Sequence, residues 1–486
     1  MFVGGMILQD TLDQPARRSF LKTTAVAAAS VATASAANKV MGANDRVRVA
    51  VIGVRGRGWD HVKGYKPIPN VELAAFCDVD ENVMRKRLAD AEQMGIPKPQ
   101  TFVDVRKLLE DKNIDAVSIA TPNHWHSLIG IWAAQAGKDI YIEKPCSHNW
   151  WEGRQLVNAI NKYKVICQHG SQCRSSAAIR DAMDQMRNGL LGDVYMSRGL
   201  CYKWRASIGH APQEPVPAGV HYDLWTGPAP MKPFTKNRFH YNWHWIWDTG
   251  NGDLGNQGIH EVDLARWGLG VGMPTKITAM GGHFMFDDDQ QTPNMLTVAY
   301  EFRTPEGKTK MMTFEVRGWM TNHESGIGTS EFGGGGVPTA GLKATASPAG
   351  EHKKAGAHLG VAQGKPSTIG NLYYGSKGYL AISNYDSYKS FLGDNNQPGP
   401  EKHLPVRNEH FVNFIDCVRS RKAEDIHAPI YEGYVSTSLV HFANASYRLG
   451  RTINYDPKTE TVVNDEEATT LLHGTYRAPY TVPEKV

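Results

Sequence analysis

The chain has 486 residues, of which 41% are hydrophobic, so it can form more than one well-packed domain. Its formal net charge of +4 is small for this length and gives no reason to expect a nucleic-acid partner. No apolar run reaches the roughly 20 residues that a membrane span requires.

The N-terminal residues predict a targeting segment. Arg17 and Arg18 open a twin-arginine pattern, an alanine-rich stretch follows, and Ala34-Ser-Ala36 offers a cleavage site. We therefore expect residues 1–37 to be a twin-arginine signal peptide, with a disordered alanine-rich tail as the alternative. The signal implies the twin-arginine export machinery as a partner. It also implies a periplasmic or otherwise exported protein that folds and loads its cofactor before export.

The six cysteines, at positions 77, 146, 167, 173, 201 and 417, do not form a disulfide framework in a chain of this length. Folding before export would keep them reduced. Cys167 and Cys173 have no third or fourth ligand at zinc spacing, so we expect all six cysteines to be packing residues.

Residues 47–52 are typical of a strand buried on both faces. The turn Gly53-Val-Arg55-Gly56-Arg57-Gly58 follows and opens a helix, which is the arrangement of a dinucleotide-binding turn. Gly53 permits the tight turn, Gly58 lets the helix approach the sheet, and the helix N-terminus would face a pyrophosphate. Arg55 displaces the middle glycine of the usual motif to Gly56, and Arg55 or Arg57 is a candidate phosphate ligand. An ordinary strand–helix turn is the alternative.

The acid expected on the cofactor ribose is Asp78, which follows the second apolar run and lies 25 residues after Gly53. Strands and helices then alternate, with helices at 81–94 and 151–163 and strands at 115–120, 139–143 and 164–168. These units predict an NAD(P)-binding Rossmann domain over residues 46–170, a doubly wound parallel sheet that binds its ligand at the carboxyl ends of the strands. A carboxylate at position 78 favours NAD, whereas Arg55 and Arg57 leave NADP open.

Beyond a helix at about 176–188 the pattern changes to longer, alternating strands at 193–198, 275–282, 295–302 and 310–317. They predict a mostly antiparallel open sheet, so that residues 171–451 form an α+β domain for substrate binding and oligomerisation. Residues 323–366 are expected to be a long Gly-rich surface loop. We expect helices at about 407–421 and 432–449 to pack back against the first domain, and residues 452–486 to form a C-terminal tail.

Three further motifs follow the glycine turn and the acid in a fixed order: Thr121-Pro-Asn-His, Glu143-Lys-Pro and Gly255-Asn-Gln-Gly-Ile-His-Glu-Val-Asp263. Together with the helix that begins near His410, they resemble the glucose–fructose oxidoreductase / inositol dehydrogenase (Gfo/Idh/MocA) family over about residues 46 to 451. The resemblance implies an NAD(P)-dependent oxidoreductase for a small carbohydrate, assembled as a homodimer or homotetramer. The twin-arginine signal is similar to that of exported members, which implies a tightly bound nicotinamide.

The resemblance also implies catalytic roles. Lys144 matches the family's catalytic lysine, whose ammonium would stabilise an oxygen as it gains negative charge; a lysine that caps a surface loop is the alternative. His260 matches the acid/base histidine, since an unperturbed pKa near 6.5 suits proton transfer; a packed helix histidine is the alternative. Asn256 stands where the family usually has an aspartate that would stabilise the imidazolium. Asp253 and Asp263 are candidate substitutes.

On the cofactor side the resemblance implies Thr121, Asn123 and His126, with helix capping as the alternative for the first two. Glu143 is expected to hold the cofactor ribose or to fix its own loop.

An aromatic segment, residues 238–248, could stack on sugar faces while its polar side chains bind hydroxyl groups. Core packing or a dimer contact explains the same composition equally well. The spacing of His240, His244 and Asp248 also suits a metal, ranked behind both, and no metal site is predicted. The candidate substrate-binding residues are Arg174, Lys203, Arg205, His240, Trp243 and His244.

These features favour an exported NAD(P)-dependent oxidoreductase of a sugar or sugar derivative with a retained nicotinamide. The first alternative is a redox-neutral glycoside hydrolase that oxidises the sugar, eliminates the glycosidic group and returns the hydride; the family includes NAD-dependent α-N-acetylgalactosaminidases. The second alternative is a non-catalytic cofactor-binding sensor. Asn256 favours a sensor, and Lys144 and His260 oppose it.

Overall fold

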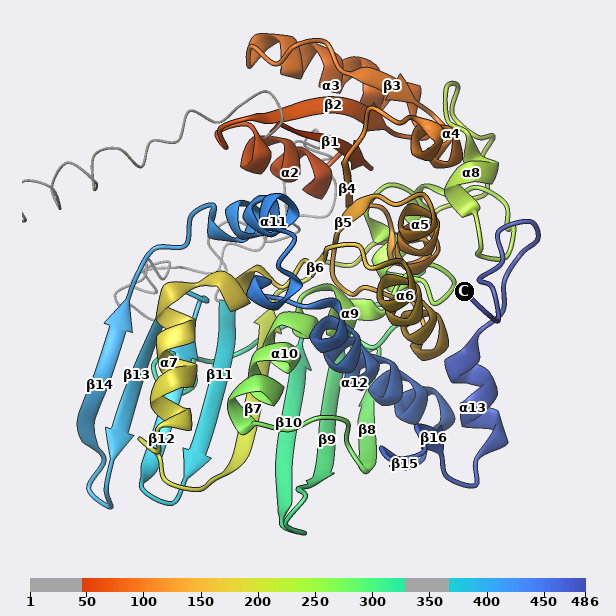
Figure 1. Ribbon diagram of the computed structural model, residues 1–486. Helices are drawn as coiled ribbons and strands as arrows, with labels where there is room; N and C mark the ends of the chain where they lie inside the picture. The colour runs from red at the N-terminus through yellow and green to blue at the C-terminus, as the bar shows by residue number, and fades with distance from the viewer. Residues whose placement is uncertain (1–45, 328–366) are drawn as a thin grey trace, which may run out of the picture. The chain divides into compact units, whose positions relative to one another are not determined.

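The computed structural model describes residues 46–327 and 367–486 (Figure 1). The predicted signal peptide, residues 1–37, lies outside the described residues, and so does the predicted surface loop beyond residue 327. No helix in the described part of the chain is long and apolar enough to cross a membrane. All six cysteines are buried and unpaired.

The first sheet is parallel throughout, in the order β3-β2-β1-β4-β5-β6, which confirms the predicted Rossmann fold. All residues of β4 and β5 are buried, as expected for strands covered by helices on both faces. The strand order reverses between β1 and β4, and ligands of such sheets bind at that switch point. The elements are β1 (Val47–Ile52), α2 (Arg57–Tyr65), β2 (Val71–Cys77), α3 (Glu81–Gln93), β3 (Gln100–Phe102), α4 (Val105–Glu110), β4 (Ala116–Ile119), α5 (Asn123–Gln135), β5 (Asp139–Ile142), α6 (Trp150–Tyr163) and β6 (Cys167–His169).

The second sheet follows a short connection, η2 (Gln172–Ser175) and α7 (Ala177–Arg187). Its order is β14-β13-β12-β11-β7-β10-β9-β8-β15-β16, and β7 and β10 are its only parallel pair among the described strands, so the mostly antiparallel prediction is confirmed. The strands are β7 (Val194–Lys203), β8 (Lys276–Gly282), β9 (Met295–Arg303), β10 (Thr309–Arg317), β11 (Ser367–Gly375), β12 (Gly378–Ser383), β13 (Ser387–Leu392), β14 (Gln397–His403), β15 (Ile453–Asp456) and β16 (Thr461–Val462).

One face of this sheet is covered by α7, α10 (Gly258–Leu269) and α12 (Ile430–Leu449) (Figure 1). Hydrogen bonds tie the layers: the Tyr300 hydroxyl donates to the Leu439 carbonyl on α12, and the Tyr373 hydroxyl donates to the Leu264 carbonyl on α10. Residues of the opposite face are exposed in alternation, among them Met280 and Met311. The sheet is therefore open on one side, as its alternating pattern predicts.

A helix from the second half of the chain packs on the Rossmann sheet. In α11 (Glu409–Ser420), the rings of Phe411 and Phe414 contact Tyr65 of α2 and Tyr141 of β5. The expected return of this helix to the first domain is confirmed. A short turn, η6 (Ala423–Asp425), then leads to α12.

Between β7 and α10 the chain makes a long excursion, residues 204–251, which we call the insert. It contains α8 (Tyr222–Thr226), η3 (Lys236–Arg238) and η4 (Asn242–Trp245), and α9 (Gly252–Asn256) follows it. The residues predicted as a C-terminal tail form β15, β16 and α13 (Glu466–His473). The polar composition of these residues gives no clear pattern from which a strand or a helix could be predicted.

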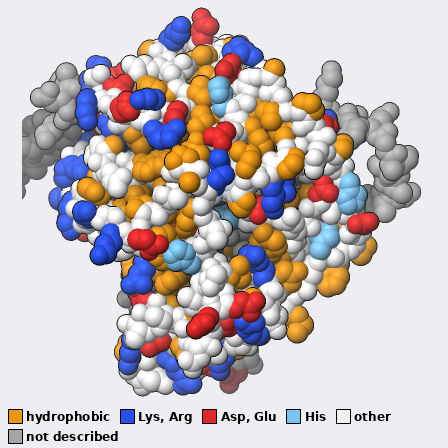
Figure 2. Space-filling view, turned by 90° about the vertical axis from the view of Figure 1, so that its right-hand side faces the viewer, with side chains coloured by type: hydrophobic (Ala, Val, Ile, Leu, Met, Phe, Trp, Pro, Cys, Tyr) orange, Lys and Arg blue, Asp and Glu red, His pale blue; other side chains and the backbone are white. Residues whose placement is uncertain are grey.

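Charge is mixed over the surface that Figure 2 draws. Basic, acidic and apolar side chains are interspersed on that face, and neither sign of charge covers it. This agrees with the small net charge of +4. The drawn face therefore offers no continuous basic surface of the kind that binds nucleic acid.

Candidate active site

The glycine turn between β1 and α2 leaves room for a ligand to approach the backbone of the turn. Gly53 has φ +82°, and a Cβ there would lie 2.8 Å from the Ala120 carbonyl oxygen; a Cβ on Gly58 would lie 1.8 Å from the Gly53 oxygen. Gly56 instead faces open space, and no side chain caps the start of α2. The first N–H groups of α2 are thus available for an anion, which fits the pyrophosphate of a dinucleotide.

The acid predicted for the ribose lies beside this turn. Asp78 accepts hydrogen bonds from the Val54 amide at 2.9 Å and from the Asp80 amide at 3.0 Å. Burial raises the pKa of Asp78 to about 6. Arg87, which the sequence analysis missed, donates from α3 to the carbonyl of Val54 at 3.1 Å and to that of Arg55. No sequence motif predicts Arg87, because it binds backbone carbonyl groups, which every residue type carries.

Glu143 and Arg57 lie against each other. The Arg57 Nε donates to Glu143 Oε1 at 2.7 Å, and His61 Nε2 donates to the same oxygen at 3.0 Å. Glu143 is buried, and despite that burial Arg57 and His61 lower its pKa well below the usual range. In this arrangement Glu143 fixes its loop to α2, and Arg57 is turned toward Glu143. His61 was not foreseen, since a lone helix histidine carries no signal.

The loop after β4 and the start of α5 contain a buried hydroxyl group that can bind a ligand and two side chains that hydrogen-bond to neighbouring loops. The hydroxyl of Thr121 is buried without a hydrogen-bond partner among the described residues, which suits a group awaiting a ligand. His126 lies between the carbonyl oxygens of Thr121 and Pro145, 2.7 Å from each. Asn123 is buried and meets Asn251 at 3.5 Å. His126 and Asn123 therefore fasten neighbouring loops.

Lys144 joins the two halves of the site. Its Nζ donates to the backbone carbonyl of Asn256 at 2.7 Å, across 112 residues of sequence. Burial lowers the pKa of Lys144 to about 8, and neighbouring Arg57 and Lys203 act in the same direction while Glu143 opposes them. The ammonium is thus charged at neutral pH but releases its proton more readily than an ordinary lysine.

His260 lies near Lys144 on the first turns of α10. Burial first, then the positive charge of Lys144, lowers the pKa of His260 well below 6.5, so the imidazole is neutral at neutral pH. Its Nδ1 lies 3.7 Å from the Cys173 thiol, and its ring lies 5.6 Å from that of Tyr385. Neither contact was foreseen, because Cys173 and Tyr385 come from segments without a motif.

Polar pairs line the same region. Arg205 forms a bidentate pair with buried Asp253, at 2.9 and 2.6 Å, and Lys203 donates to Gln257 at 2.9 Å. His244 is close enough to Asp253 and Lys144 for their charges to act on its pKa, which burial lowers to about 3. The structure therefore brings Lys203, Arg205 and His244 near Lys144. Trp243 is buried, and its indole donates to the His240 carbonyl.

Two predicted substrate residues lie elsewhere. Arg174 makes a buried bidentate pair with Asp263, at 2.8 Å for both bonds, and stacks over Trp267. This holds η2 to α10, so the arrangement does not support a substrate contact. Asp263 is thus paired with Arg174, whereas Asp253, itself paired with Arg205, is the carboxylate beside Asn256, 3.5 Å from its side-chain nitrogen. His240 lies 2.9 Å from Asp80, on the ribose side of the cofactor site.

The spacing of His240, His244 and Asp248 does not produce a metal site. Their segment forms 3-10 turns, and Asp248 pairs with Lys232 at 2.6 Å. Within residues 46–327 and 367–486 no cluster of three or more histidine, cysteine or acidic residues is arranged to hold a metal.

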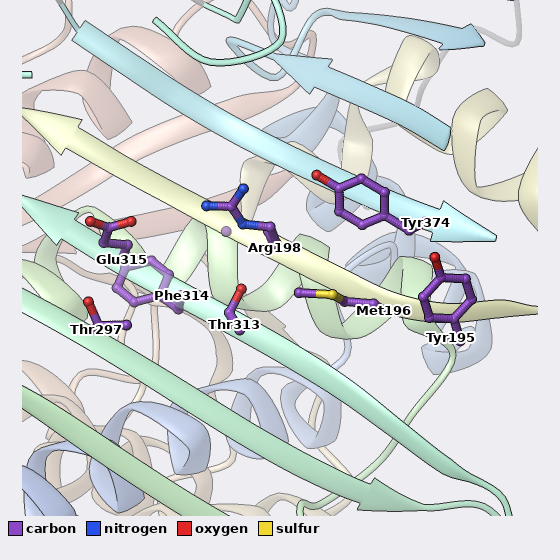
Figure 3. A pocket seen from close by; sticks show the side chains of 9 residues that line it. Tyr195, Met196, Arg198, Thr297, Thr313, Phe314, Glu315 and Tyr374 are labelled. Carbon is purple, nitrogen blue, oxygen red and sulfur yellow. The ribbon is translucent and has the colours of Figure 1, made fainter. Parts of the chain in front are cut away.

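A hollow of about 480 Å³ lies on the large sheet, away from these residues (Figure 3). Its lining comes from β7, β9, β10 and β11 and includes Tyr195, Arg198, Glu315 and Tyr374. None of the predicted site residues lines it.

Comparisons with known proteins agree with this geometry. Residues 47–171 match the model of an oxidoreductase family with an NAD-binding Rossmann fold (GFO_IDH_MocA), and residues 176–295 and 372–482 match its C-terminal alpha/beta domain. The first part of the chain is thus an NAD-binding Rossmann domain.

Curated relatives match a shorter stretch. The chain is 30% identical over 200 residues to a "Glycosyl hydrolase family 109 protein" of Shewanella pealeana, and 27% identical over 201 residues to one of Shewanella baltica. Each match covers 37% of this chain and 44% of the relative. The matched stretch therefore spans less than half the length of these proteins.

Solved structures share the fold over most of the chain. The WlbA dehydrogenase of Bordetella pertussis, in complex with NADH and UDP-GlcNAcA, is 19% identical with a TM-score of 0.57, over 85% of this chain and 99% of that chain. Levoglucosan dehydrogenase in complex with NADH and levoglucosan is 16% identical with a TM-score of 0.58, over 84% and 99%. At these identities the likeness shows the fold.

Proposed function

Because the chain belongs to the Gfo/Idh/MocA oxidoreductase family, we propose that it oxidises a hydroxyl-bearing carbon of a sugar or sugar derivative with an NAD or NADP that stays bound between turnovers. The observation that carries this proposal is Lys144, a half-buried ammonium with a pKa near 8 at the point where β5 of the Rossmann sheet meets the α9–α10 junction. A cation in that position can stabilise an oxygen that gains negative charge.

The residues divide the chemistry between them. Lys144 would exchange its bond to the Asn256 carbonyl for one to the reacting oxygen. His260, neutral at neutral pH, would take the hydroxyl proton. The Arg205–Asp253 and Lys203–Gln257 pairs would orient the remaining hydroxyl groups. Bound NAD(P) would supply the acceptor for the hydride that leaves the substrate carbon.

Retention of the cofactor follows from the proposed location. The twin-arginine pattern of residues 17–22 supports export of the folded protein. An exported enzyme cannot draw on the cytoplasmic pool of NAD, so a releasable cofactor would end activity after one turnover. The hydride must then return, either to a second sugar or to the same molecule.

The second candidate function is a redox-neutral glycoside hydrolase, and the name of the curated relatives favours it. Oxidation to a ketone would acidify the neighbouring C–H. Loss of that proton would expel the glycosidic group, water would add to the resulting double bond, and reduction of the ketone would restore the alcohol. The net reaction is hydrolysis, and Lys144 and His260 serve the same oxygen in both directions.

One experiment separates the candidates. Purified protein is incubated with a panel of sugars and glycosides, while the absorbance of reduced nicotinamide and the released sugar are followed. An oxidoreductase that holds its cofactor needs an added acceptor for repeated turnover. A redox-neutral hydrolase turns over a glycoside alone and exchanges solvent deuterium into the carbon beside the transient ketone. Bound cofactor without turnover of any compound would favour the sensor, and soluble NAD consumed stoichiometrically would contradict retention.

We also propose that the protein is a homodimer or homotetramer. The open face of the large sheet carries exposed apolar side chains, including Tyr195, Met280 and Met311, which suit an interface. Light scattering on the purified protein gives the assembly size, and a monomer at all concentrations would contradict this proposal.

A further inference from the structure

The insert returns to the Rossmann domain and pairs with the loop after β2 through its backbone. Val220 and Asp80 form an isolated antiparallel bridge. The His221 amide donates to the Val79 carbonyl at 2.9 Å, and the Glu81 amide donates to the Gly219 carbonyl at 2.9 Å. These bonds join segments about 140 residues apart in the chain into a short ladder.

Side chains reinforce the ladder. Asn82 Nδ2 donates to the Ala218 carbonyl at 3.0 Å, and His221 Nε2 lies 3.0 Å from Glu81 Oε1. From the other end of the insert, His240 Nε2 reaches Asp80 Oδ2 at 2.9 Å. Asp80 is only 4% exposed, whereas the His240 side chain is 29% exposed, so this contact is partly sheltered from water.

The ladder lies beside the acid that the Rossmann fold uses for the ribose. Asp78 follows β2, and its Oδ1 accepts the amide of Asp80, the residue that the insert pairs with. Arg55 of the glycine turn is near enough for the charges of Asp78 and Asp80 to act on it. The adenosine end of a dinucleotide binds at this edge of the sheet.

The insert has a second attachment to the Rossmann domain, at α8. Trp125 Nε1 of α5 donates to the Trp225 carbonyl at 3.0 Å. Near the C-terminus, Arg477 pairs with Asp223 at 2.7 Å, and its Nε donates to the Gly227 carbonyl at 2.9 Å. The insert is therefore fastened to the Rossmann domain at two separate places.

From these contacts we infer that residues 218–221 and His240 form the outer wall of the adenosine-ribose site, so that the insert must separate from the loop after β2 before the dinucleotide leaves. The inference rests on the proposed function for its ligand and gives the retained cofactor a structural basis. A ligand enclosed by hydrogen-bonded backbone is released only as often as that backbone opens.

The test measures cofactor release without any sugar substrate. Protein loaded with isotope-labelled NAD is chased with excess unlabelled NAD, and the label that remains bound is followed over time. The double variant His221→Ala/His240→Ala removes both side-chain contacts of these histidines. His221→Pro removes the amide that donates to Val79, at a φ of −85° that is close to the range of proline. Lys236→Ala is the matched control, because Lys236 pairs with Glu214 inside the insert.

Release from the double variant is expected to be about 25-fold faster, since the loss of each of the two hydrogen bonds corresponds to roughly five-fold. His221→Pro should also accelerate release, and Lys236→Ala should not. Hydrogen exchange at the Glu81 amide, which donates to the Gly219 carbonyl, should rise in step with release. Slow release that is equal in the wild type and all variants overturns the inference about the insert but agrees with a retained cofactor. Fast release already in the wild type overturns both the inference about the insert and the proposal that the cofactor is retained.

Discussion

The ammonium of Lys144 donates to the backbone carbonyl of Asn256 at 2.7 Å, which joins the end of β5 to the helix junction that carries His260. The residue that accepts this hydrogen bond from Lys144, the proposed catalytic lysine, is thus the residue where an aspartate is expected from the family pattern. A carboxylate on residue 256 would sit beside both the ammonium and Asp253, whose Oδ1 is 3.5 Å from the present amide.

Lys144→Ala should lower kcat by at least about 10²-fold, the usual cost of losing an acid/base group, while NAD stays bound. Because Lys144 has a pKa near 8, it is charged below that pH, and wild-type activity should fall as the pH rises through about 8. A pH–rate profile with turnover constant between pH 7 and 10 would exclude an essential ammonium.

Asn256→Asp should move this alkaline limb to higher pH, because a nearby carboxylate stabilises the charged lysine. The new carboxylate and Asp253 should also repel each other, which raises the pKa of one of the two carboxyl groups. Asn242→Asp introduces the same charge at a residue that contacts Asn237, and serves as the control. An unchanged alkaline limb in Asn256→Asp would contradict the assignment of that limb to Lys144.

The affinity for NAD should depend on the protonation of Asp78. Its pKa near 6 means that the carboxylate, which we propose accepts the ribose hydroxyls, is ionised above about pH 6 and becomes neutral below it. Calorimetry on cofactor-free protein should show weaker NAD binding below pH 6, and Asp78→Asn should remove that dependence. Asp78→Ala should weaken NAD more than NADP, since a carboxylate repels a 2′-phosphate. Equal losses for both nucleotides would argue against NAD preference.

The elements that sequence predicts well are those whose burial pattern is regular. Strands β1, β2, β4 and β5 are short and apolar because helices cover both faces of their sheet, and the helices at 81–93 and 430–449 keep an apolar face. Strands β11 to β14 were not foreseen. The sequence of β14, Gln-Pro-Gly-Pro-Glu-Lys-His, carries no strand pattern, because this strand is almost entirely exposed. Its strand pairing comes from the neighbouring strand rather than from its own side chains.

The same distinction holds in the site. Motifs predict Lys144, His260 and Asp78, because the proposed chemistry constrains their type and spacing. Arg87 contacts backbone carbonyl groups, and His61 and Cys173 each contact another side chain. Many residue types could make such contacts, so no motif predicts these three residues. Arg174 is a different case. Its place after the last Rossmann strand suggests a ligand, but the fold pairs it with Asp263.

Arg174→Ala should therefore reduce stability and leave kcat/KM of the folded protein nearly unchanged. Removing one partner of a buried ion pair costs about 3–5 kcal/mol. Arg174 holds the pKa of Asp263 near 2, so the pair stabilises the fold above the ordinary aspartate pKa, and that contribution is lost as the pH falls through about 2. Urea unfolding at neutral and acidic pH measures both effects. Normal stability with a raised KM would restore the substrate role.

Export should depend on the two arginines at the N-terminus. Replacing Arg17 and Arg18 by lysines keeps the charge but removes the feature that the twin-arginine pathway recognises. The variant should remain in the cytoplasm at its full length, whereas the wild type should be shortened and exported. Fractionation with mass measurement of the N-terminus decides between them. Unchanged processing would show that residues 1–37 are not this signal.

The tautomer of His260 should depend on Cys173. Burial raises the pKa of the Cys173 thiol and lowers that of His260, so both groups are neutral and only a hydrogen bond joins Sγ and Nδ1. If Nδ1–H donates to the sulfur, Nε2 keeps its lone pair for the substrate proton. Cys173→Ser retains an acceptor and should keep most activity, while Cys173→Ala should lower kcat about five-fold, the equivalent of one neutral hydrogen bond. Imidazole nitrogen chemical shifts should show a mixed tautomer in Cys173→Ala and one tautomer in the wild type. Cys417→Ser, at a buried cysteine in α11, is the control. A single tautomer and full activity in Cys173→Ala would mean that the thiol only fills space beside His260.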